Sequence, residues 1–187
     1  MIVLGSASPR RSEIMKLMGL EFTVRPAKDE KHPDGLDGDP GEFARVSALY
    51  KAANVAERSD AGDTVIGADT VVSIDGRILG KPKDADDAFR MLKLLSGRTH
   101  TVFTGYAIIK DDRTVSGYEA TLVEFREMTD DEIRAYVKTG EPMDKAGAYG
   151  IQGFGCVNVR RIEGDYFNVM GFPACTVYEK LSEIQSV

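Results

Sequence analysis

The chain has 187 residues, of which 42 % are hydrophobic, and its formal net charge at pH 7 is −6. This length suits one compact domain, or two small lobes that share a cleft, and no apolar run approaches the roughly eighteen residues that a membrane-spanning helix needs. Proteins that follow a nucleic-acid backbone usually carry a basic surface, so the acidic balance argues against a polymeric nucleic-acid partner and leaves a small anionic ligand open.

Predicted strands and helices alternate along the chain. A strand over residues 2–5 comes first, and a helix over 9–18 follows with Ser8 as its N-cap. The second helix is expected to begin at a capping box of Asp39 and Glu42, to end near residue 57 and to bury a face of four apolar residues. That face carries Phe43, Val46, Leu49 and Ala53.

The remaining predicted elements continue this alternation. The further helices cover 84–95, 129–138 and the segment after Pro173, and the further strands cover 22–25, 64–74, 77–79, 99–110, 114–127, 156–162 and 167–170. Residues 28–42 and 139–155 are expected to form long loops, which are often functional in a small domain. The pattern predicts one α/β domain over residues 1–187, with a mixed twisted sheet and flanking helices.

The stretch GSASPRR, residues 5–11, joins the first strand to the first helix. The free N–H groups of a helix start, the hydroxyl of Ser6 and the guanidinium groups of Arg10 and Arg11 together suit a phosphate group. Cations at a helix N-terminus cost about 0.3–1 kcal/mol each, so both arginines are expected to be dispensable for folding. The alternative is a plain Ser-Pro cap followed by two solvated arginines.

Asp69 stands in the largely apolar stretch VIGADTVVSIDG. A buried carboxylate is costly unless it is paired, hydrogen-bonded or bound to a metal. Its position therefore indicates a chemical role, and the alternative is an aspartate that caps a turn at the end of the strand.

Two lysines are candidates for contacts with an anion. Lys81 precedes Pro82, which favours an extended backbone, and it follows Asp69 by one hairpin. Lys51 shares a predicted helix face with small apolar residues, where it can bury its stem and extend its ammonium group. Ordinary surface lysines are the alternative in both cases.

The second long loop contains the glycine-rich stretch DKAGAYGIQGFG. Its glycines allow the backbone to approach a ligand closely, and the amide of Gln152 offers the donor and the acceptor that can read the edge of a base. Asp29 and Glu30 begin the first long loop and offer carboxylates for a cation. A flexible loop with a solvated glutamine, and solvated loop carboxylates, are the alternatives.

Together these candidates supply cations for phosphate, two separated acids and an amide reader. This set suits the hydrolysis of a nucleotide with a bound divalent metal. The two histidines, His32 and His100, are far apart, which disfavours a transition-metal site and leaves oxygen-ligated Mg²⁺ or Mn²⁺ open. No secretory signal is predicted, so a cytoplasmic location is expected, with Cys156 and Cys175 reduced and packed inside the fold.

Several motifs resemble, in the same order, those of the Maf family of nucleoside triphosphate pyrophosphatases. They are SASPRR, GADTVV, GKP, LSGRTH, MDKAGAYGIQG and EGDYFNVMGFP, and they extend over nearly the whole chain. The stretch DKAGAYGIQG is similar to the branch that cleaves dTTP and UTP, whereas the sister branch that cleaves 7-methyl-GTP lacks it. The resemblance implies a Maf/ITPase-like fold with two lobes around a nucleotide-binding cleft.

The resemblance also implies an activity and a role for each candidate. Cleavage between the α- and β-phosphates would release pyrophosphate and a monophosphate, with Mg²⁺ or Mn²⁺ as cofactor. Asp69 would act as base, metal ligand or both, and Glu30 would help to hold the metal. Phosphate binding would fall to Ser6, Arg11, Lys51 and Lys81, and substrate specificity to Arg10, Thr70 and Gln152.

Other activities stay open at this point. Modified pyrimidine triphosphates are further candidate substrates, and another nucleotide such as 7-methyl-GTP is the alternative within the enzyme class. A nucleotide-dependent binding protein that affects septum formation is the alternative from another class. Family resemblance also implies a homodimer.

Overall fold

The computed structural model describes residues 1–28, 33, 35–36 and 38–185, and a mixed seven-stranded sheet forms its centre. The strands are β1 (Ile2–Leu4), β2 (Phe22–Val24), β3 (Thr64–Ile74), β4 (Arg77–Leu79), β5 (Thr99–Lys110), β6 (Arg113–Phe125) and β7 (Val159–Glu163). Their order is β2-β1-β3-β5-β6-β7, and β4 pairs with β3 off this path. Strand β1 runs parallel to β2 and β3, and the other pairs are antiparallel. The predicted mixed α/β class is confirmed.

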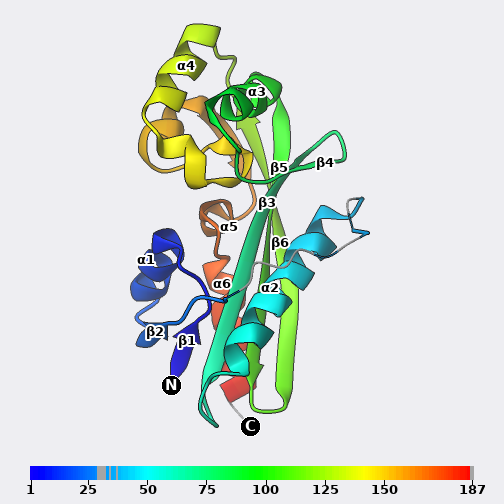
Figure 1. Cartoon of the computed structure of the whole chain (residues 1–187), viewed down its shortest axis with the longest axis vertical. Coiled ribbons are helices and arrows are strands. Elements are labelled where there is room, and N and C mark those ends of the chain that lie inside the picture. The colour runs from blue at the N-terminus through cyan, green and yellow to red at the C-terminus, as the bar shows by residue number, and fades with distance from the viewer. Residues whose placement is uncertain (29–32, 34, 37, 186–187) are drawn as a thin grey trace.

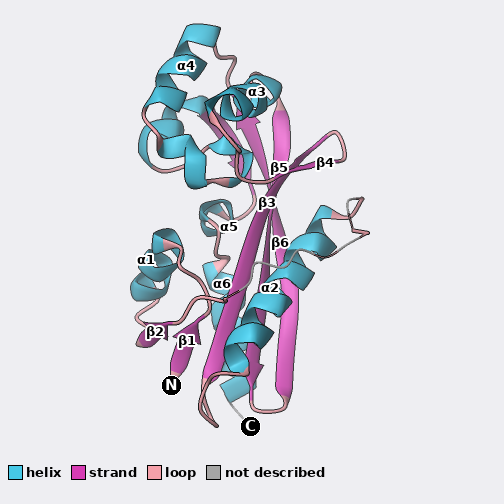
Figure 2. Ribbon diagram, viewed as in Figure 1, coloured by secondary structure: helices cyan, strands magenta, loops and turns pink. Residues whose placement is uncertain are grey.

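Helices cover both faces of the sheet and its upper end (Figure 1, Figure 2). The α-helices are α1 (Pro9–Leu17), α2 (Pro40–Ala56), α3 (Ala85–Leu95), α4 (Asp130–Lys138), α5 (Tyr166–Met170) and α6 (Ala174–Gln185). Three short 3₁₀ segments follow α4, namely η1 (Glu141–Asp144), η2 (Ala146–Ala148) and η3 (Gly153–Asn158). None of the helices in the described part of the chain combines the length and the apolarity that spanning a bilayer requires.

The long strands β3, β5 and β6 connect two lobes (Figure 1). The upper lobe contains α3, α4 and the 3₁₀ segments around a core that includes Leu92, Phe125 and Ile133. The lower lobe contains β1, β2, α1 and α6. There, alternate residues of β3 point to opposite faces, so Ile66 packs in the cluster with α1 and α6 whereas Val65 packs in the cluster with α2. The strands that cross both lobes therefore form the wall from which a site between the lobes can be built.

Helix α2 lies very close to the sheet. A Cβ added to Gly67 of β3 would lie 2.5 Å from the backbone oxygen of Ala48, and one added to Gly105 of β5 would collide with the backbone of Ala44. The apolar face predicted to be buried in this helix was therefore wrong. The two glycines leave room for α2 to approach the sheet, and the helix turns its smaller residues toward them. The buried face consists of Gly41, Ala44, Ser47, Ala48, Lys51, Ala52 and Val55, while Phe43, Val46, Leu49 and Ala53 are half-buried. This packing places Lys51 against the sheet.

Two predicted strands near the C-terminus were also wrong in whole or in part. Residues 167–170 form helix α5, because the Asp165 side chain accepts a hydrogen bond from the N–H of Phe167 and Gly171 ends the helix with a φ of 107°. Residues 156–158 belong to η3, so β7 begins only at Val159.

Two smaller expectations also differ from the structure. Asp39 caps α2, but the carboxylate of Glu42 binds Arg45 instead of returning to the cap. Cys156 and Cys175 are free thiols, as expected, but both are exposed, so neither is part of the core.

Candidate active site

A cavity of about 930 Å³ lies between the two lobes, which is the size of a small-molecule site. Every site residue expected from the sequence that the structure describes lines it: Ser6, Arg10, Arg11, Lys51, Asp69, Thr70, Lys81 and Gln152. Glu30 and its neighbour Asp29, the expected loop carboxylates, lie outside the described residues. Segments far apart in the sequence thus converge on one cavity.

Arg11 is buried in the lower wall of the cavity, with only 9 % of its surface exposed. Its Nε donates to the carbonyl of Gly171 at 2.8 Å, and its two terminal nitrogens donate to the Ser6 hydroxyl at 2.9 Å and the Thr70 hydroxyl at 3.1 Å. This guanidinium joins the turn after β1, strand β3 and the end of α5. The expectation that Arg11 is dispensable for folding therefore conflicts with its contacts.

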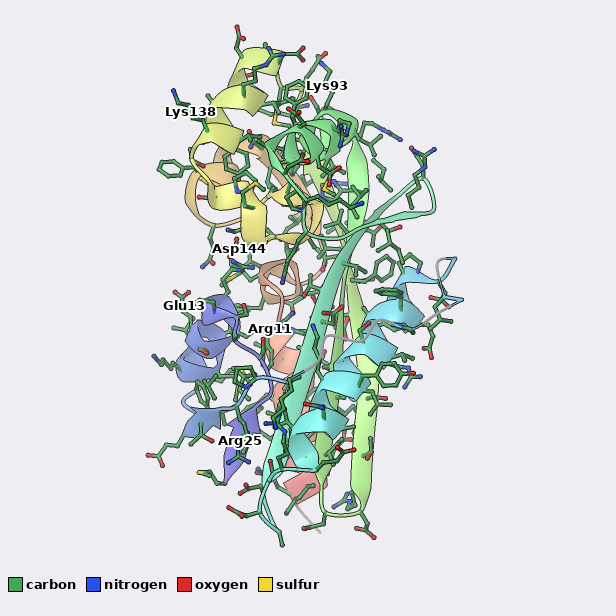
Figure 3. The ribbon with its side chains drawn as sticks, viewed as in Figure 1. Arg11, Glu13, Arg25, Lys93, Lys138 and Asp144 are labelled. Atoms are coloured by element: carbon green, nitrogen blue, oxygen red, sulfur yellow. The ribbon has the colours of Figure 1, made fainter. Side chains whose placement is uncertain are left out.

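Arg10 points to the other side of the cavity. Its Nη1 lies 3.3 Å from a carboxylate oxygen of Asp144 in η1, so this ion pair links α1 to the upper lobe. Figure 3 shows Asp144 on the upper lobe and Arg11 on the lower one. Lys145 also binds Asp144 at 2.7 Å. Burial opposes ionisation of Asp144, but the hydrogen bonds and charges of Lys145 and Arg10 outweigh it and hold the pKa of this carboxyl below its usual value.

Asp69 and Lys51 form a buried ion pair in the wall of the cavity. Strand β3 presents Asp69 opposite Gly105 of β5, and helix α2 brings the Nζ of Lys51 to 2.5 Å from Oδ1 of Asp69. The side chain of Asp69 is 11 % exposed and that of Lys51 is 9 % exposed. The sequence expectation that a carboxylate at this position needs a partner is confirmed, and the partner is one of the two candidate lysines.

Thr70, Lys81 and Gln152 complete the described lining. The Thr70 hydroxyl shares a hydrogen bond of 3.0 Å with Thr104, whose hydroxyl donates to the backbone oxygen of Asn168. Lys81 is exposed on the loop after β4, and Gln152 is half-buried just before η3. These residues come from both lobes, so a ligand in the cavity would contact both.

The comparison with known proteins agrees with this architecture. The model of the Maf-like protein family matches residues 1–184. The chain belongs to this family. A relative from Thermococcus gammatolerans named dTTP/UTP pyrophosphatase is 54 % identical over 98 % of this chain and 96 % of its own length. A relative of the same name from Bacillus cytotoxicus is 46 % identical over 98 % and 95 %.

A solved structure shares the fold of this Maf chain. The HAM1 protein from Coxiella burnetii has a TM-score of 0.54 and 17 % sequence identity, and the match covers 99 % of this chain and 98 % of that one. At this identity the likeness concerns the fold alone.

The described residues can supply part of a site for a hard divalent cation. Mg²⁺ prefers oxygen ligands and commonly binds through one or two carboxylates together with substrate phosphates. Asp69 offers such a carboxylate at the cavity wall, while the part of the chain that the structure describes contains no cluster of three or more acidic, histidine or cysteine ligands. This donor set therefore fits a cation that is bound jointly with a phosphate ligand.

The sequence did not reveal a second group of residues that holds the glycine-rich loop. The hydroxyl of Tyr136 in α4 donates to Glu141, and the carboxylate of Glu141 accepts from the N–H groups of Phe154 and Gly155. In addition, Nε2 of His100 lies 2.7 Å from the Tyr149 hydroxyl. The motifs LSGRTH and DKAGAYG contain His100 and Tyr149, but only the folded chain brings them together.

Proposed function

We propose that this chain hydrolyses dTTP and UTP to the nucleoside monophosphate and pyrophosphate. The observation that carries the proposal is the buried Asp69–Lys51 pair in the wall of a cavity between two lobes, with two arginines beside it. Relatives that bear the name dTTP/UTP pyrophosphatase and match nearly the full chain at 54 % and 46 % identity support the same substrates.

In this proposal the phosphate chain lies against the cations of the cavity. Arg10 and Lys81 offer donors, and Ser6, Arg11 and Lys51 line the same cavity. Neutralising the charge of the triphosphate lowers its repulsion of an attacking water. Arg10 would exchange its ion pair with Asp144 for a phosphate contact.

Asp69 takes the proton of the attacking water in this proposal. Its carboxylate is held in place by Lys51, which fixes the direction from which a water can be deprotonated. A divalent cation, Mg²⁺ or Mn²⁺, held by Asp69 and by Glu30 outside the described residues, would offset negative charge on the phosphates. Gln152, Thr70 and Arg10 would select the nucleotide.

The broader setting follows from the same proposal. Free nucleoside triphosphates as substrates suit the cytoplasmic location, the single domain over residues 1–187 and the absence of a nucleic-acid or membrane partner that the sequence predicts. The homodimer implied by family resemblance is part of the proposal and can be measured by light scattering.

A panel of nucleoside triphosphates tests the proposal. Purified protein with Mg²⁺ or Mn²⁺ is incubated with dTTP, UTP, CTP, 7-methyl-GTP and modified pyrimidine triphosphates, and pyrophosphate release is measured. We expect dTTP and UTP to be hydrolysed at similar rates and well above CTP. A preference for 7-methyl-GTP would identify a different substrate, and nucleotide binding without release of pyrophosphate would support a binding protein.

A further inference from the structure

The segment that carries Gln152 is closed into a small loop by two side chains of the upper lobe. At its start, the N–H of Gly150 donates to the Tyr136 hydroxyl at 3.2 Å. That hydroxyl donates to Oε1 of Glu141 at 2.7 Å, and the same oxygen accepts from the N–H of Gly155 at 3.0 Å. One continuous chain of hydrogen bonds thus joins the two ends of segment 150–155.

The other oxygen of Glu141 holds the middle of the same segment. Oε2 accepts from the N–H of Phe154 at 2.8 Å. Burial opposes the charged form of Glu141, but the hydrogen bonds from Tyr136, Phe154 and Gly155 outweigh it, so its pKa lies below the ordinary value. The carboxylate therefore stays ionised at neutral pH and presents acceptors to all three donors.

The glycines of this segment fit the same arrangement. A Cβ on Gly155 would lie 2.6 Å from the Tyr136 hydroxyl, and Gly153, with a φ of 68°, faces the carboxylate of Glu141 so closely that a Cβ there would collide with it. The loop can surround Glu141 only because these positions lack side chains.

Gln152 lies between Gly150 and Phe154, whose N–H groups are hydrogen-bonded to Tyr136 and Glu141. Its side chain has no hydrogen-bond partner among the described residues, and it lines the cavity between the lobes. Selectivity for a base arises when the wrong base leaves a buried polar group without a hydrogen-bond partner. The side chain that reads the base must therefore be held in one position, which requires a fixed backbone. The only carboxylate that fixes this backbone in the described part of the chain is Glu141.

We propose that Glu141 is a positioning residue: through Tyr136 and the N–H groups of Phe154 and Gly155 it fixes where Gln152 meets the base, and so sets the selectivity between UTP and CTP. This inference rests on the proposed function, and it adds a residue that acts through the backbone of the loop that carries Gln152.

The test compares Glu141→Gln with a matched control, Glu132→Gln. Glutamine keeps the size of the side chain but turns one acceptor oxygen into a donor that faces an N–H or O–H group. Glu132 caps helix α4 by accepting from the backbone N–H and the hydroxyl of Thr129, and it also pairs with Arg126 at 2.9 Å. Its substitution therefore weakens a comparable set of contacts, while the hydrogen bonds that hold segment 150–155 stay in place. Tyr136→Phe provides a second variant that removes only the bridging hydroxyl.

Two measurements are made on each variant. Hydrogen exchange of segment 150–155 without nucleotide reports how firmly the loop is held, and kcat/KM for UTP and CTP reports selectivity. For Glu141→Gln we expect about tenfold faster exchange at Gly150, Phe154 and Gly155 and an about tenfold smaller UTP-to-CTP ratio, with a smaller change in kcat for UTP. Tyr136→Phe should also speed up exchange and lower the UTP-to-CTP ratio. Glu132→Gln should leave the exchange rate and the ratio unchanged.

Three results would overturn the inference. The first is a Glu141→Gln protein whose exchange and ratio match the wild type. The second is faster exchange with an unchanged ratio, and the third is an equal fall of the ratio in the Glu132→Gln control, which would indicate general destabilisation. A wild type that does not hydrolyse UTP would refute the proposed function and the selectivity role together, while the exchange data would still show whether Glu141 holds the loop.

Discussion

The ammonium group of Lys51 and the carboxylate of Asp69 lie 2.5 Å apart although the two residues belong to different elements, a helix and a strand. Their meeting depends on the close approach of α2 to the sheet at Gly67 and Gly105. Breaking a buried ion pair by removing one partner is costly because an uncompensated charge remains. The pair therefore couples the packing of the helix to the position of the proposed base.

Asp69→Asn tests the role of the carboxylate. Asparagine is nearly isosteric and keeps an oxygen for Lys51, but it cannot accept the proton of water. General-base catalysis typically contributes about 10²–10⁴-fold, so we expect kcat for UTP to fall by at least this order while circular dichroism shows a retained fold. Asp75→Asn, at the exposed turn after the same strand, is the control and should retain its activity. Turnover by Asp69→Asn within a few-fold of wild type would exclude Asp69 as the base.

Arg10 and Arg11 should respond differently to alanine substitution. Arg11→Ala removes a buried guanidinium that donates to Ser6, Thr70 and Gly171. Because hydrogen bonds to charged groups contribute about 1.5–3 kcal/mol, we expect the free energy of unfolding to fall by roughly 2–4 kcal/mol and Tm to fall by about 4–16 °C.

Arg10→Ala removes a partly exposed ion pair with Asp144, which is worth about 0–1 kcal/mol. Its Tm should stay within about 3 °C of the wild type, while the affinity for UTP falls. Thermal melting and nucleotide titration measure both effects. Equal Tm values for the two variants would contradict the structural role given to Arg11.

Gln152→Ala tests how the base is recognised. Uracil and thymine present two carbonyl acceptors around one N–H donor, and the amide of Gln152 can match an acceptor and the donor. Cytosine reverses part of this pattern, and an unpaired buried polar group costs about 1–3 kcal/mol, or roughly ten- to a hundredfold in selectivity. We expect the variant to narrow the UTP-to-CTP ratio of kcat/KM more than it lowers kcat. Gln185→Ala, at the exposed end of α6, is the control, and an unchanged ratio in Gln152→Ala would exclude Gln152 as the reader.

His100 should make folding stability depend on pH. Burial lowers its pKa to about 4, against 6.5 for the unperturbed group. The unfolded chain therefore binds a proton below about pH 6.5 that the folded chain binds only below about pH 4, so stability falls as the pH is lowered through this window. The size of the effect is about 3 kcal/mol.

His100→Gln keeps a polar group beside Tyr149 but does not titrate. Chemical denaturation of both proteins between pH 7 and 4 should show a steeper loss of unfolding free energy in the wild type. Parallel curves would mean that His100 does not contribute to the pH dependence. Carboxyl groups titrate in both proteins, so only the difference between the curves is informative.

Local sequence signals predicted most elements correctly because their causes are local. Thr129 and Glu132 form the expected capping box, and Asp84 caps α3 through the N–H of Asp87. Helix α5 was mistaken for a strand because its aromatic and β-branched residues favour one. The cap at Asp165 and the stop at Gly171 are six residues apart and could have indicated the short helix.

The sequence predicted residues that line the cavity, but it did not predict their contacts. Motifs located the candidates lining the cavity, yet the bonds of Arg11 to Gly171 and of Lys51 to Asp69 join positions 160 and 18 residues apart. Glu141 carries no local signal, because its role depends on backbone N–H groups that face it only after the loop has folded.

The products of UTP hydrolysis test the central claim most directly. Purified wild-type protein is incubated with UTP and Mg²⁺ or Mn²⁺, and the products are separated and identified by mass spectrometry. The account predicts UMP and pyrophosphate, because the bond between the α- and β-phosphates is broken. UDP and inorganic phosphate as the first products, or no turnover of UTP or dTTP, would contradict it.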